Sequence, residues 1–322
     1  MKSIGGMSLQ NFKIKCIGTY IPDNYVNNMD LLTTFEVSPD FIENKLGIIR
    51  RSKIKEHQTL ADMCLSAWHD LEKKIKIDIE NIDLVCTVTQ TPDHKAPYMS
   101  AILHNKIGLS KKCITFDIGQ GCAGFCHALL TVLSMMKTLH LKNALFFTCD
   151  QLSRILDPKD KNTVLLFGDA ATVTYITKDV STGYILKDWD FGTLPNSYET
   201  IIEKNFLRMD GRMVFNNVLK EIPASIKNLL LKNGLDTCDI SEFLCHQPSR
   251  YLLERLSSTL NLKENQLKFK AANYGNTSSS SIPLILEPHL KQKDANYLVL
   301  SGFGTGFSWC NCLLTLTGGK NE

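Results

Sequence analysis

The stretch DIGQGCAGFCHALL, residues 117–130, contains a cysteine that could act as a nucleophile. Cys122 lies among glycines and alanines, where an apolar run begins to show helical spacing. The partial positive charge of a helix N-terminus favours a thiolate over a thiol, and small neighbours let a substrate come close. The alternative is packing, because cysteine is also a small hydrophobe that is often buried. The stretch alone leaves both interpretations open.

Two further side chains could take part in the same chemistry. His246 lies near the end of the apolar, strand-like run EFLCHQ (242–247). A histidine at the end of a strand lies at the rim of a sheet, where functional residues gather in open α/β folds. Asn276 lies in YGNTSSSSIP (274–283), between a glycine and a Thr-Ser pair. Capping of the next helix explains the serines of this stretch but not the asparagine. For a single histidine, a structural role is the commoner alternative.

A glycine-rich turn, SGFGTGFSWC (301–310), follows an apolar run near the end of the sequence. Glycines permit tight turns and close backbone approach, and a backbone N–H in such a turn could form half of an oxyanion hole. The turn lacks the lysine of a phosphate-binding loop, so we exclude nucleotide binding of that kind.

These residues need a scaffold of alternating strands and helices. Short apolar runs predict strands at 82–90, 144–150, 242–247 and 296–304. Apolar spacings near three and four predict helices at 61–75, 123–139 and 218–234, the last ending at Asn-Gly. This alternation predicts an α/β fold with parallel or mixed sheets.

The sequence also shows a weak internal repeat. Each half carries a helix, an apolar strand and a Gly- or Ser-rich turn that leads into another helix. We therefore expect two α/β halves that pack as one body. The first, residues 1–178, carries Cys122, and the second, residues 179–322, carries His246 and Asn276.

Composition excludes several classes of protein. The net charge of +3 comes without basic blocks, so we expect no nucleic-acid partner. No run reaches the roughly 18 apolar residues of a membrane span, and we expect no membrane partner. The 11 cysteines show no CxxC spacing, so we expect no metal site. With no secretory segment, we expect a cytoplasmic protein with reduced thiols.

Together the motifs resemble the thiolase superfamily, and within it the β-ketoacyl-acyl-carrier-protein synthase III family. The nucleophile motif is Cys122-Ala-Gly-Phe125, and the histidine motif is His246-Gln247. The GNTS motif places Asn276 30 residues after the histidine (276 − 246), and GTGFSW (304–309) matches the terminal signature. LFGDAA (166–171) matches another signature, and the resemblance covers the chain from about Phe12 onward.

The resemblance implies a thiolase-like fold with duplicated βαβαβαββ halves in five layers, α-β-α-β-α. It implies that an acyl thioester acylates Cys122, with backbone N–H groups of Cys122, Thr305 and Gly306 holding the oxyanion. His246 and Asn276 then stabilise the enolate of a malonyl thioester as carbon dioxide leaves. The implied enzyme is a homodimeric acyltransferase that uses acyl-coenzyme A and acyl carrier protein, with no tightly bound cofactor.

The residues at the predicted substrate entrance depart from the family pattern. Phe41 and Lys45 stand where the family has a tryptophan and an arginine, and Lys161-Asn162 replaces Arg-Gly. Lysine keeps the charge but loses the planar stack, so we expect weaker nucleotide binding or a donor held on a carrier protein. Arg250, a candidate carrier-protein contact, is displaced by one position.

The predicted acyl pocket contains Ala96 and Phe307. The family often has a phenylalanine before the proline of the segment that crosses the dimer interface, and HKAP (94–97) has Ala96 there. We expect a larger pocket that favours donors longer than acetyl. Thr305 replaces a glycine, which narrows the turn and keeps the backbone donor.

Two other functions stay open. One is acyl transfer to an amine or hydroxyl without decarboxylation, although such relatives often lose the asparagine that is present here as Asn276. The other is a non-catalytic subunit of a heterodimer, which the intact Cys122 and His246 disfavour. Decarboxylative condensation in fatty-acid or specialised lipid or secondary-metabolite synthesis is the leading hypothesis.

Overall fold

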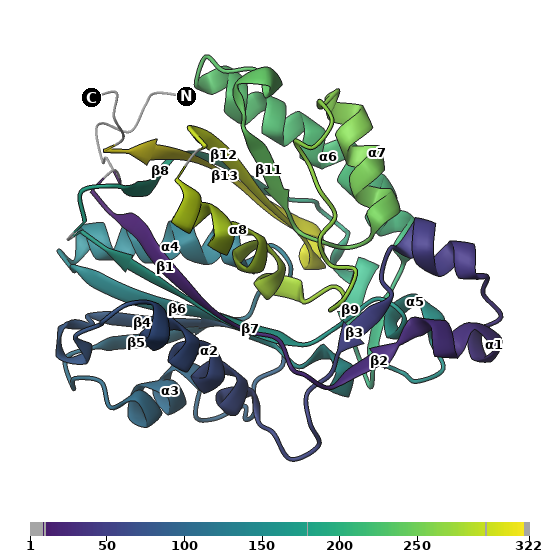
Figure 1. Cartoon of the computed structure of the whole chain (residues 1–322), viewed down its shortest axis with the longest axis horizontal. Coiled ribbons are helices and arrows are strands. Elements are labelled where there is room, and N and C mark those ends of the chain that lie inside the picture. The colour runs from purple at the N-terminus through teal and green to yellow at the C-terminus, as the bar shows by residue number, and fades with distance from the viewer. Residues whose placement is uncertain (1–8, 10, 179, 294, 319–322) are drawn as a thin grey trace.

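The computed structural model describes residues 9, 11–178, 180–293 and 295–318, in which strands and helices alternate (Figure 1). The strands are β1 (Lys13–Tyr20), β2 (Tyr25–Asn27), β3 (Arg50–Ser52), β4 (Leu84–Val88), β5 (Ile114–Ile118), β6 (Asn143–Asp150), β7 (Ala170–Thr177), β8 (Gly183–Thr193), β9 (Ile201–Glu203), β10 (Leu207–Met209), β11 (Glu242–Cys245), β12 (Tyr297–Gly304) and β13 (Ser308–Thr317). The helices are α1 (Leu32–Phe35), α2 (Leu60–Lys74), α3 (Met99–Ile107), α4 (Gly124–Thr138), α5 (Lys161–Val164), α6 (Gly211–Lys232), α7 (Arg250–Leu260) and α8 (Ser281–Gln292). The predicted α/β class is confirmed.

Five strands of the N-terminal half lie side by side in the order β5-β4-β6-β7-β1. β4 pairs in parallel with β5 and β6, whereas β7 runs antiparallel to β6 and β1. β4 and β6 are buried along their whole length, as expected of strands that are covered on both faces. They correspond to the predicted strands at 82–90 and 144–150.

The C-terminal half repeats this order with four strands, β11-β12-β13-β8. A full copy of the first half would add a strand beyond β11. Instead, Phe243 donates its N–H to the carbonyl of Gln266 at 2.7 Å, and Lys270 donates its N–H to the side chain of Gln247 at 2.7 Å. Among the described residues, the second half therefore repeats the first with one strand fewer. Beside β11, the side chain of Gln247 bonds the neighbouring segment where a further strand would pair through its backbone.

The two groups of strands enclose a central layer of helices. They join at one residue pair, Ile14–Tyr184 between β1 and β8, and a single core joins both groups to α4 and α8. A second core lies beneath α2 and α3, and a third beneath α6 and α7. Figure 1 shows α4 and α8 between the two sets of strands. The predicted five-layer α-β-α-β-α arrangement is confirmed.

The predicted division of the chain at residues 178 and 179 falls in the connection from β7 to β8. β7 ends at Thr177 and β8 begins at Gly183, while residue 179 itself lies outside the described residues. We keep this division as a proposal.

Helix ends follow local side-chain chemistry. Thr59 and Asp62 form a reciprocal capping box at the start of α2, and Asn233-Gly234 ends α6 as predicted. α6 begins at Gly211, seven residues before its predicted start (218 − 211), because the Asp210 carboxylate accepts the N–H of Met213. Among the described residues, no helix is long and apolar enough to span a membrane.

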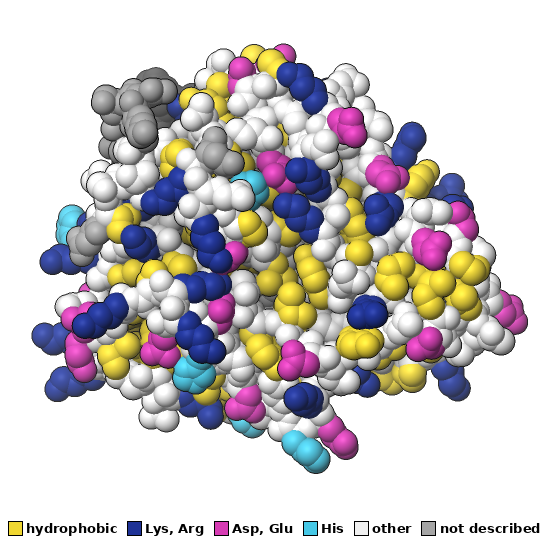
Figure 2. All heavy atoms as spheres, in the orientation of Figure 1, with side chains coloured by type: hydrophobic (Ala, Val, Ile, Leu, Met, Phe, Trp, Pro, Cys, Tyr) yellow, Lys and Arg dark blue, Asp and Glu magenta, His cyan; other side chains and the backbone are white. Residues whose placement is uncertain are grey.

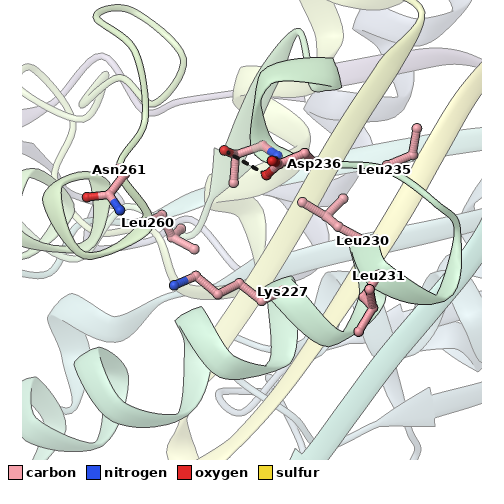
Figure 3. Close-up of a pocket in the computed structure, with 8 residues that line it drawn as sticks. Lys227, Leu230, Leu231, Leu235, Asp236, Leu260 and Asn261 are labelled. Atoms are coloured by element: carbon pink, nitrogen blue, oxygen red, sulfur yellow. Dashed lines mark hydrogen bonds between the residues drawn. The ribbon is translucent and has the colours of Figure 1, made fainter.

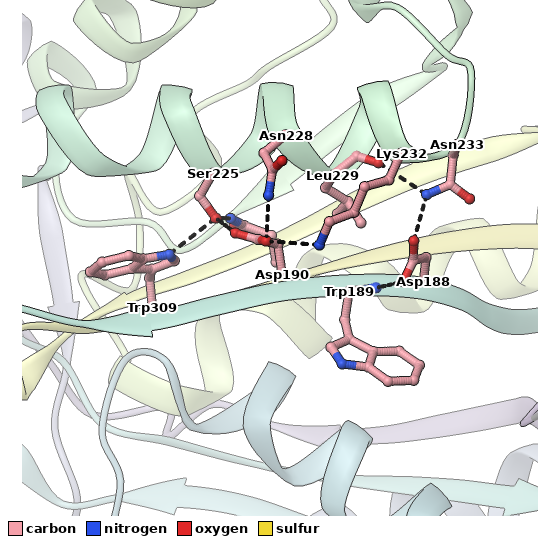
Figure 4. A network of polar contacts seen from close by, with 10 residues as sticks. Asp188, Trp189, Asp190, Ser225, Asn228, Leu229, Lys232, Asn233 and Trp309 are labelled. Carbon is pink, nitrogen blue, oxygen red and sulfur yellow. Dashed lines mark hydrogen bonds and ion pairs between the residues drawn. The ribbon is translucent and has the colours of Figure 1, made fainter. Parts of the chain in front are cut away.

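A buried polar network fastens α6 to the second set of strands (Figure 4). Ser225 of α6 donates to Asp190 of β8 at 2.5 Å and accepts the Trp309 indole N–H at 3.0 Å. A methyl group at Gly192 would lie 2.2 Å from the Trp309 ring, so only a glycine lets that ring lie flat on β8. The network therefore anchors the beginning of β13, directly after the glycine-rich turn.

The central layer generates a stability prediction. Phe125 of α4 is fully buried and its ring centroid lies 5.1 Å from that of Phe146. Phe125→Ala leaves a cavity between the two sets of strands and lowers the free energy of unfolding by about 3–5 kcal/mol. Urea denaturation at fixed protein concentration measures it. Leu139→Ala, at the half-exposed end of the same helix, is the control and changes the free energy of unfolding by less than about 0.5 kcal/mol. Equal losses of unfolding free energy in the two variants would contradict the layered core.

Candidate active site

Cys122 lies where the two halves of the protein meet. It sits between β5 and α4, two residues before that helix begins, and is 6% exposed. The backbone of β12 passes directly over it: a methyl group at Gly304 would lie 2.7 Å from Cys122 Cβ and 3.1 Å from Sγ. Gly302 makes a similar approach to Ala123. Gly302 and Gly304 therefore let the second half reach the cysteine and its neighbour.

The environment of Cys122 keeps its thiol protonated at rest. Burial and the nearby Asp150 carboxylate raise the thiol pKa to about 12, while the Ser278 hydroxyl and the cysteine's own N–H oppose that rise. Burial therefore opposes the thiolate that the helix N-terminus was expected to favour. Deprotonation must accompany the reaction.

His246 follows β11 and is held by three contacts. Its N–H donates to the carbonyl of Ser301 at 2.8 Å, its Nδ1 lies 2.7 Å from Ser281 Oγ, and its ring meets the edge of Phe303 with centroids 5.6 Å apart. Burial lowers the pKa of the imidazole to about 3, so the ring is neutral. With Nδ1 engaged, a substrate would meet Nε2.

Asn276 is braced by the LFGDAA segment. Its N–H donates to the carbonyl of Leu166, and its carbonyl accepts the N–H of Gly168, both at 2.9 Å. Its side-chain Oδ1 accepts the N–H of Ser278 at 3.0 Å, which fixes the orientation of the amide. The preceding Gly275 has φ +83°, a backbone conformation that favours glycine. The Nδ2 end of the amide is therefore presented to a substrate.

The four serines after Asn276 support the site, and the expectation that they cap a helix is wrong. Neither Thr277 nor Ser280 makes a side-chain capping bond. Each serine hydroxyl is buried and bonds a different partner instead. The pairs are Ser278 with Cys122, Ser279 with Asp150, Ser280 with Thr148, and Ser281 with His246. The run Ser278–Ser281 thus links Cys122 of the first half with His246 of the second.

The turn after β12 carries the predicted oxyanion donors Thr305 and Gly306. The Thr305 hydroxyl points at Gln90 Oε1, 3.5 Å away, and its carbonyl accepts the hydroxyl of Ser308 at 2.8 Å. Gly306 has φ +126°, which favours glycine. Phe307, predicted in the acyl pocket, is fully buried in the outer core with α6 and α7.

The structure brings part of the predicted entrance together. Phe41, Lys161 and Asn162 line one pocket of about 190 Å³, which also includes Pro248 and Ser249, just after the His-Gln motif. Lys45 is exposed on the turn Phe41–Leu46. Arg250 packs over Phe269 at 5.4 Å and lines a different cavity. One pocket thus joins Phe41 and Lys161 to the two residues that follow the His-Gln motif.

An aromatic pair that was not predicted from the sequence lies beside this pocket. Phe215 of α6 lines the pocket, and its ring stacks on Tyr251 of α7 with centroids 5.7 Å apart and an angle of 9° between the planes. Tyr251 is 45% exposed. Apolar spacing predicted α6 only from residue 218, so the expected helix did not include Phe215.

Ala96 lies on an exposed segment, away from the buried site of its own chain. Its place is compatible with a role only where a second chain covers it. The size effect that we expect from Ala96 stays a prediction.

Two other cavities lie apart from the predicted site residues. One of about 540 Å³ lies between the ends of α6 and α7, lined by Lys227, Leu231 and Asn261 among others (Figure 3). Another of about 270 Å³ lies beside α1, where Figure 2 shows hydrophobic side chains gathered on a face with interspersed charges. Neither contains Cys122, His246 or Asn276.

Comparisons with known proteins indicate the family of this chain. Residues 116–194 match the profile described as 3-oxoacyl-[acyl-carrier-protein (ACP)] synthase III, and residues 230–316 match its C-terminal counterpart. The β-ketoacyl-[acyl-carrier-protein] synthase III of Lactobacillus helveticus is 30% identical, covering 94% of this chain and 98% of its own. The β-ketoacyl-[acyl-carrier-protein] synthase III of Neisseria meningitidis serogroup B is 31% identical, covering 95% of this chain and 99% of its own. The crystal structure of β-ketoacyl-[acyl-carrier-protein] synthase III from Thermus thermophilus superposes on this chain with a TM-score of 0.87 at 26% identity. The superposition covers 95% of this chain and 99% of that one.

A thiolase fold with a buried cysteine, histidine and asparagine defines an enzyme of the acyltransferase class. This chain belongs to the β-ketoacyl-[acyl-carrier-protein] synthase III family. The resemblance seen in the sequence motifs is confirmed.

The close approach at Gly304 generates a prediction. Gly304→Ala places a methyl group against Cys122 and reduces acylation of the thiol by at least about 100-fold, since small misplacements of reacting groups cost that much. Intact-protein mass spectrometry measures the acylated fraction. Gly119→Ala is the control, because a methyl group there meets nothing within 4 Å. Equal acylation of Gly304→Ala and wild type would contradict the close contact.

Proposed function

We propose that this enzyme transfers an acyl group from a thioester to Cys122 and then condenses it with malonyl-acyl-carrier protein to give a 3-oxoacyl product. The observation that carries the proposal is the serine run. It ties Cys122 of one half to His246 and Asn276 of the other within one buried site. Forming a covalent acyl-cysteine divides the reaction into two easier steps.

The backbone stabilises the charge that develops in the first step. Sγ attacks the thioester carbonyl, and the carbonyl oxygen becomes an oxyanion. The N–H groups of Cys122, Thr305 and Gly306 are our candidate donors to that oxygen, since β12 brings the turn against the cysteine. Fixed donors in a buried site need little reorganisation as the charge forms.

His246 and Asn276 act in the second step. Each donates a hydrogen bond to the malonyl thioester carbonyl, which stabilises the enolate formed as carbon dioxide leaves. For His246 this requires Nε2 to carry the proton, so Ser281 must turn its own proton to Nδ1 rather than to the carbonyl of Ser278, 2.9 Å away. The low pKa of His246 keeps the ring neutral, and an amide stays neutral at every working pH.

The acyl donor reaches the site through the pocket at Phe41, Lys161 and Asn162. A lysine attracts the phosphate of a phosphopantetheine arm as a point charge, without the planar stack of an arginine. The donor is therefore an acyl-carrier protein or an acyl-coenzyme A held with few contacts to its nucleotide. We expect no tightly bound cofactor and a cytoplasmic enzyme.

The enzyme acts as a homodimer in this proposal. β5 lies at the end of the strand order, and all five of its residues are half-buried, including the apolar Ile114, Phe116 and Ile118. An unpaired strand edge invites pairing with a second copy. The same arrangement would cover the exposed segment that holds Ala96.

Acyl transfer without decarboxylation is the second candidate function. It needs only Cys122 and the oxyanion donors, whereas the buried, oriented amide of Asn276 favours condensation. A non-catalytic subunit would need neither, so the intact site disfavours that role.

Intact-protein mass spectrometry with a panel of acyl-coenzyme A and acyl-carrier thioesters tests this function. The wild type gains the mass of one acyl group, Cys122→Ala gains none, and the size of the gain identifies the donor. Adding malonyl-carrier protein then releases carbon dioxide and removes the added mass. Loss of the acyl group to an amine or alcohol without carbon dioxide would favour simple transfer, and acylation of Cys122→Ala would refute the nucleophile.

Restoring an aromatic ring at Ala96 tests the predicted acyl pocket. Ala96→Phe fills space contributed across the dimer interface and shifts the preference toward short acyl chains by about 10-fold, on the order of the discrimination that one or two methylenes give. Competition between acetyl and longer acyl thioesters measures the shift. An unchanged chain-length preference in a dimeric variant would contradict the assignment.

A further inference from the structure

Asp150 is a buried carboxylate for which the reaction above has no role. It ends β6 and is 0% exposed. One oxygen, Oδ1, accepts the N–H of Gln90 at 2.8 Å and the hydroxyls of Thr89 and Thr91, each at 3.2 Å. The other, Oδ2, accepts the hydroxyl of Ser279 at 3.3 Å. No lysine or arginine pairs with it among the ion pairs of the described residues.

Ser278 connects this carboxylate to the nucleophile. The Cys122 thiol donates to Ser278 Oγ across 4.0 Å, and the Ser278 hydroxyl is close enough to the Asp150 carboxylate to lower the pKa of that carboxyl. Ser278 has φ +52°, unusual for a residue other than glycine, and its N–H is fixed on Asn276 Oδ1. The backbone therefore holds one hydroxyl beside both the thiol and the carboxylate.

Two negative charges cannot be stable this close together in a buried site. The Asp150 carboxylate is one of the causes that raise the Cys122 pKa. A thiolate formed while Asp150 stays ionised would meet that repulsion without a nearby cation. If the thiol proton moves to Asp150, the site keeps one negative charge, now on sulfur.

We propose that Asp150 accepts the Cys122 proton through Ser278 when the thiol attacks, an inference that deepens the proposed function and rests on it for the acyl substrate. The S–H bond breaks as its proton passes to Ser278 Oγ, and the Ser278 proton passes to Asp150. The sulfur electron pair forms the new bond to the acyl carbon. The leaving thiolate of the donor takes its proton from water.

The same proton returns at the end of the cycle. In condensation, the malonyl enolate attacks the acyl-cysteine and expels the Cys122 thiolate. Neutral Asp150 then reprotonates that sulfur through Ser278, and the carboxylate is restored. Asp150 touches neither substrate nor sulfur, so it is a positioning residue that stores a proton between the two steps.

The pKa values of the site favour Asp150 over His246 as the group that takes the proton when sulfur forms its new bond. Burial raises the pKa of Asp150 to about 6, whereas burial lowers that of His246 to about 3. Asp150 is thus the better proton acceptor of the two and is ionised above about pH 6. The titratable groups that face Asp150 are Cys122 beside α4 and Cys149 of β6, and the uncharged hydroxyls are those of the loop after β4 and of the Ser278–Ser280 turn.

Iodoacetamide tests the relay independently of any substrate. Alkylation of Cys122 also requires loss of the thiol proton, and peptide mass spectrometry separates Cys122 from the exposed Cys238. In the wild type, the alkylation rate rises around pH 6, as Asp150 ionises, and is then level to about pH 9. Asp150→Asn and Ser278→Ala each slow alkylation at least 10-fold at pH 7.5 and lose the level region, because a positioned base contributes about 100-fold or more.

The opposite sign would overturn the proposal. If Asp150 only repels the thiolate, Asp150→Asn alkylates faster than the wild type. Unchanged alkylation of Ser278→Ala would equally refute the relay, and this variant leaves the carboxylate in place if Asp150→Asn does not fold. Ser134→Ala is the control: this serine lies on α4, its hydroxyl bonds the Leu130 carbonyl, and its loss keeps the wild-type pH profile.

The outcome is distinguishable from a failure of the proposed function. A wild type that shows the pH 6 limb in alkylation but accepts no acyl donor would support the relay and refute the acyl chemistry. In the opposite case, the wild type is acylated normally, but the logarithm of its alkylation rate rises with pH at a slope of one up to high pH. That result would support the acyl chemistry and refute the relay.

Discussion

The burial of the central layer between two sets of strands constrains everything else in this protein. α4 and α8 lie between two sets of strands, so a polar group placed there must find a partner within the protein or cost the free energy of an unpaired buried group. The serine run after Asn276 meets this demand. Each hydroxyl satisfies a polar group of the site, and the same bonds join the half that carries the nucleophile to the half that carries the histidine and asparagine.

The same constraint decides which groups carry charge. Burial keeps the Cys122 thiol protonated and the His246 imidazole neutral, and it leaves the Asp150 carboxylate as the charged member of the set. A site with one negative charge can move that charge from oxygen to sulfur without creating a second one. Catalysis in this protein then depends on relocating a proton within a fixed network rather than on a thiolate that is present from the start.

The sequence predicted the parts of this arrangement that are local. Apolar runs and helical spacing located β4, β6, β12 and α4, and the motifs identified Cys122, His246 and Asn276. Contacts between distant segments were not accessible, because nothing local in the sequence connects Asp150 with Ser278. The serines were interpreted as helix caps, the commoner role of serine before a helix, whereas the fold turns all four hydroxyls inward. The predicted entrance residues do not all line one pocket, for a similar reason. Arg250 follows the His-Gln motif closely in sequence, yet helix geometry directs its side chain onto Phe269.

Cys122 and His246 act in separate steps, the thiol of Cys122 taking the acyl group and His246 stabilising the enolate. Measuring acylation and carbon dioxide release separately in His246→Ala tests it most directly. His246 bonds Ser281, whereas Cys122 is linked to Ser278 and Asp150, so the acylation step should survive. The account predicts acylation within about threefold of wild type and a loss of carbon dioxide release of at least about 100-fold. Equal losses in both steps, or unchanged carbon dioxide release, would contradict it.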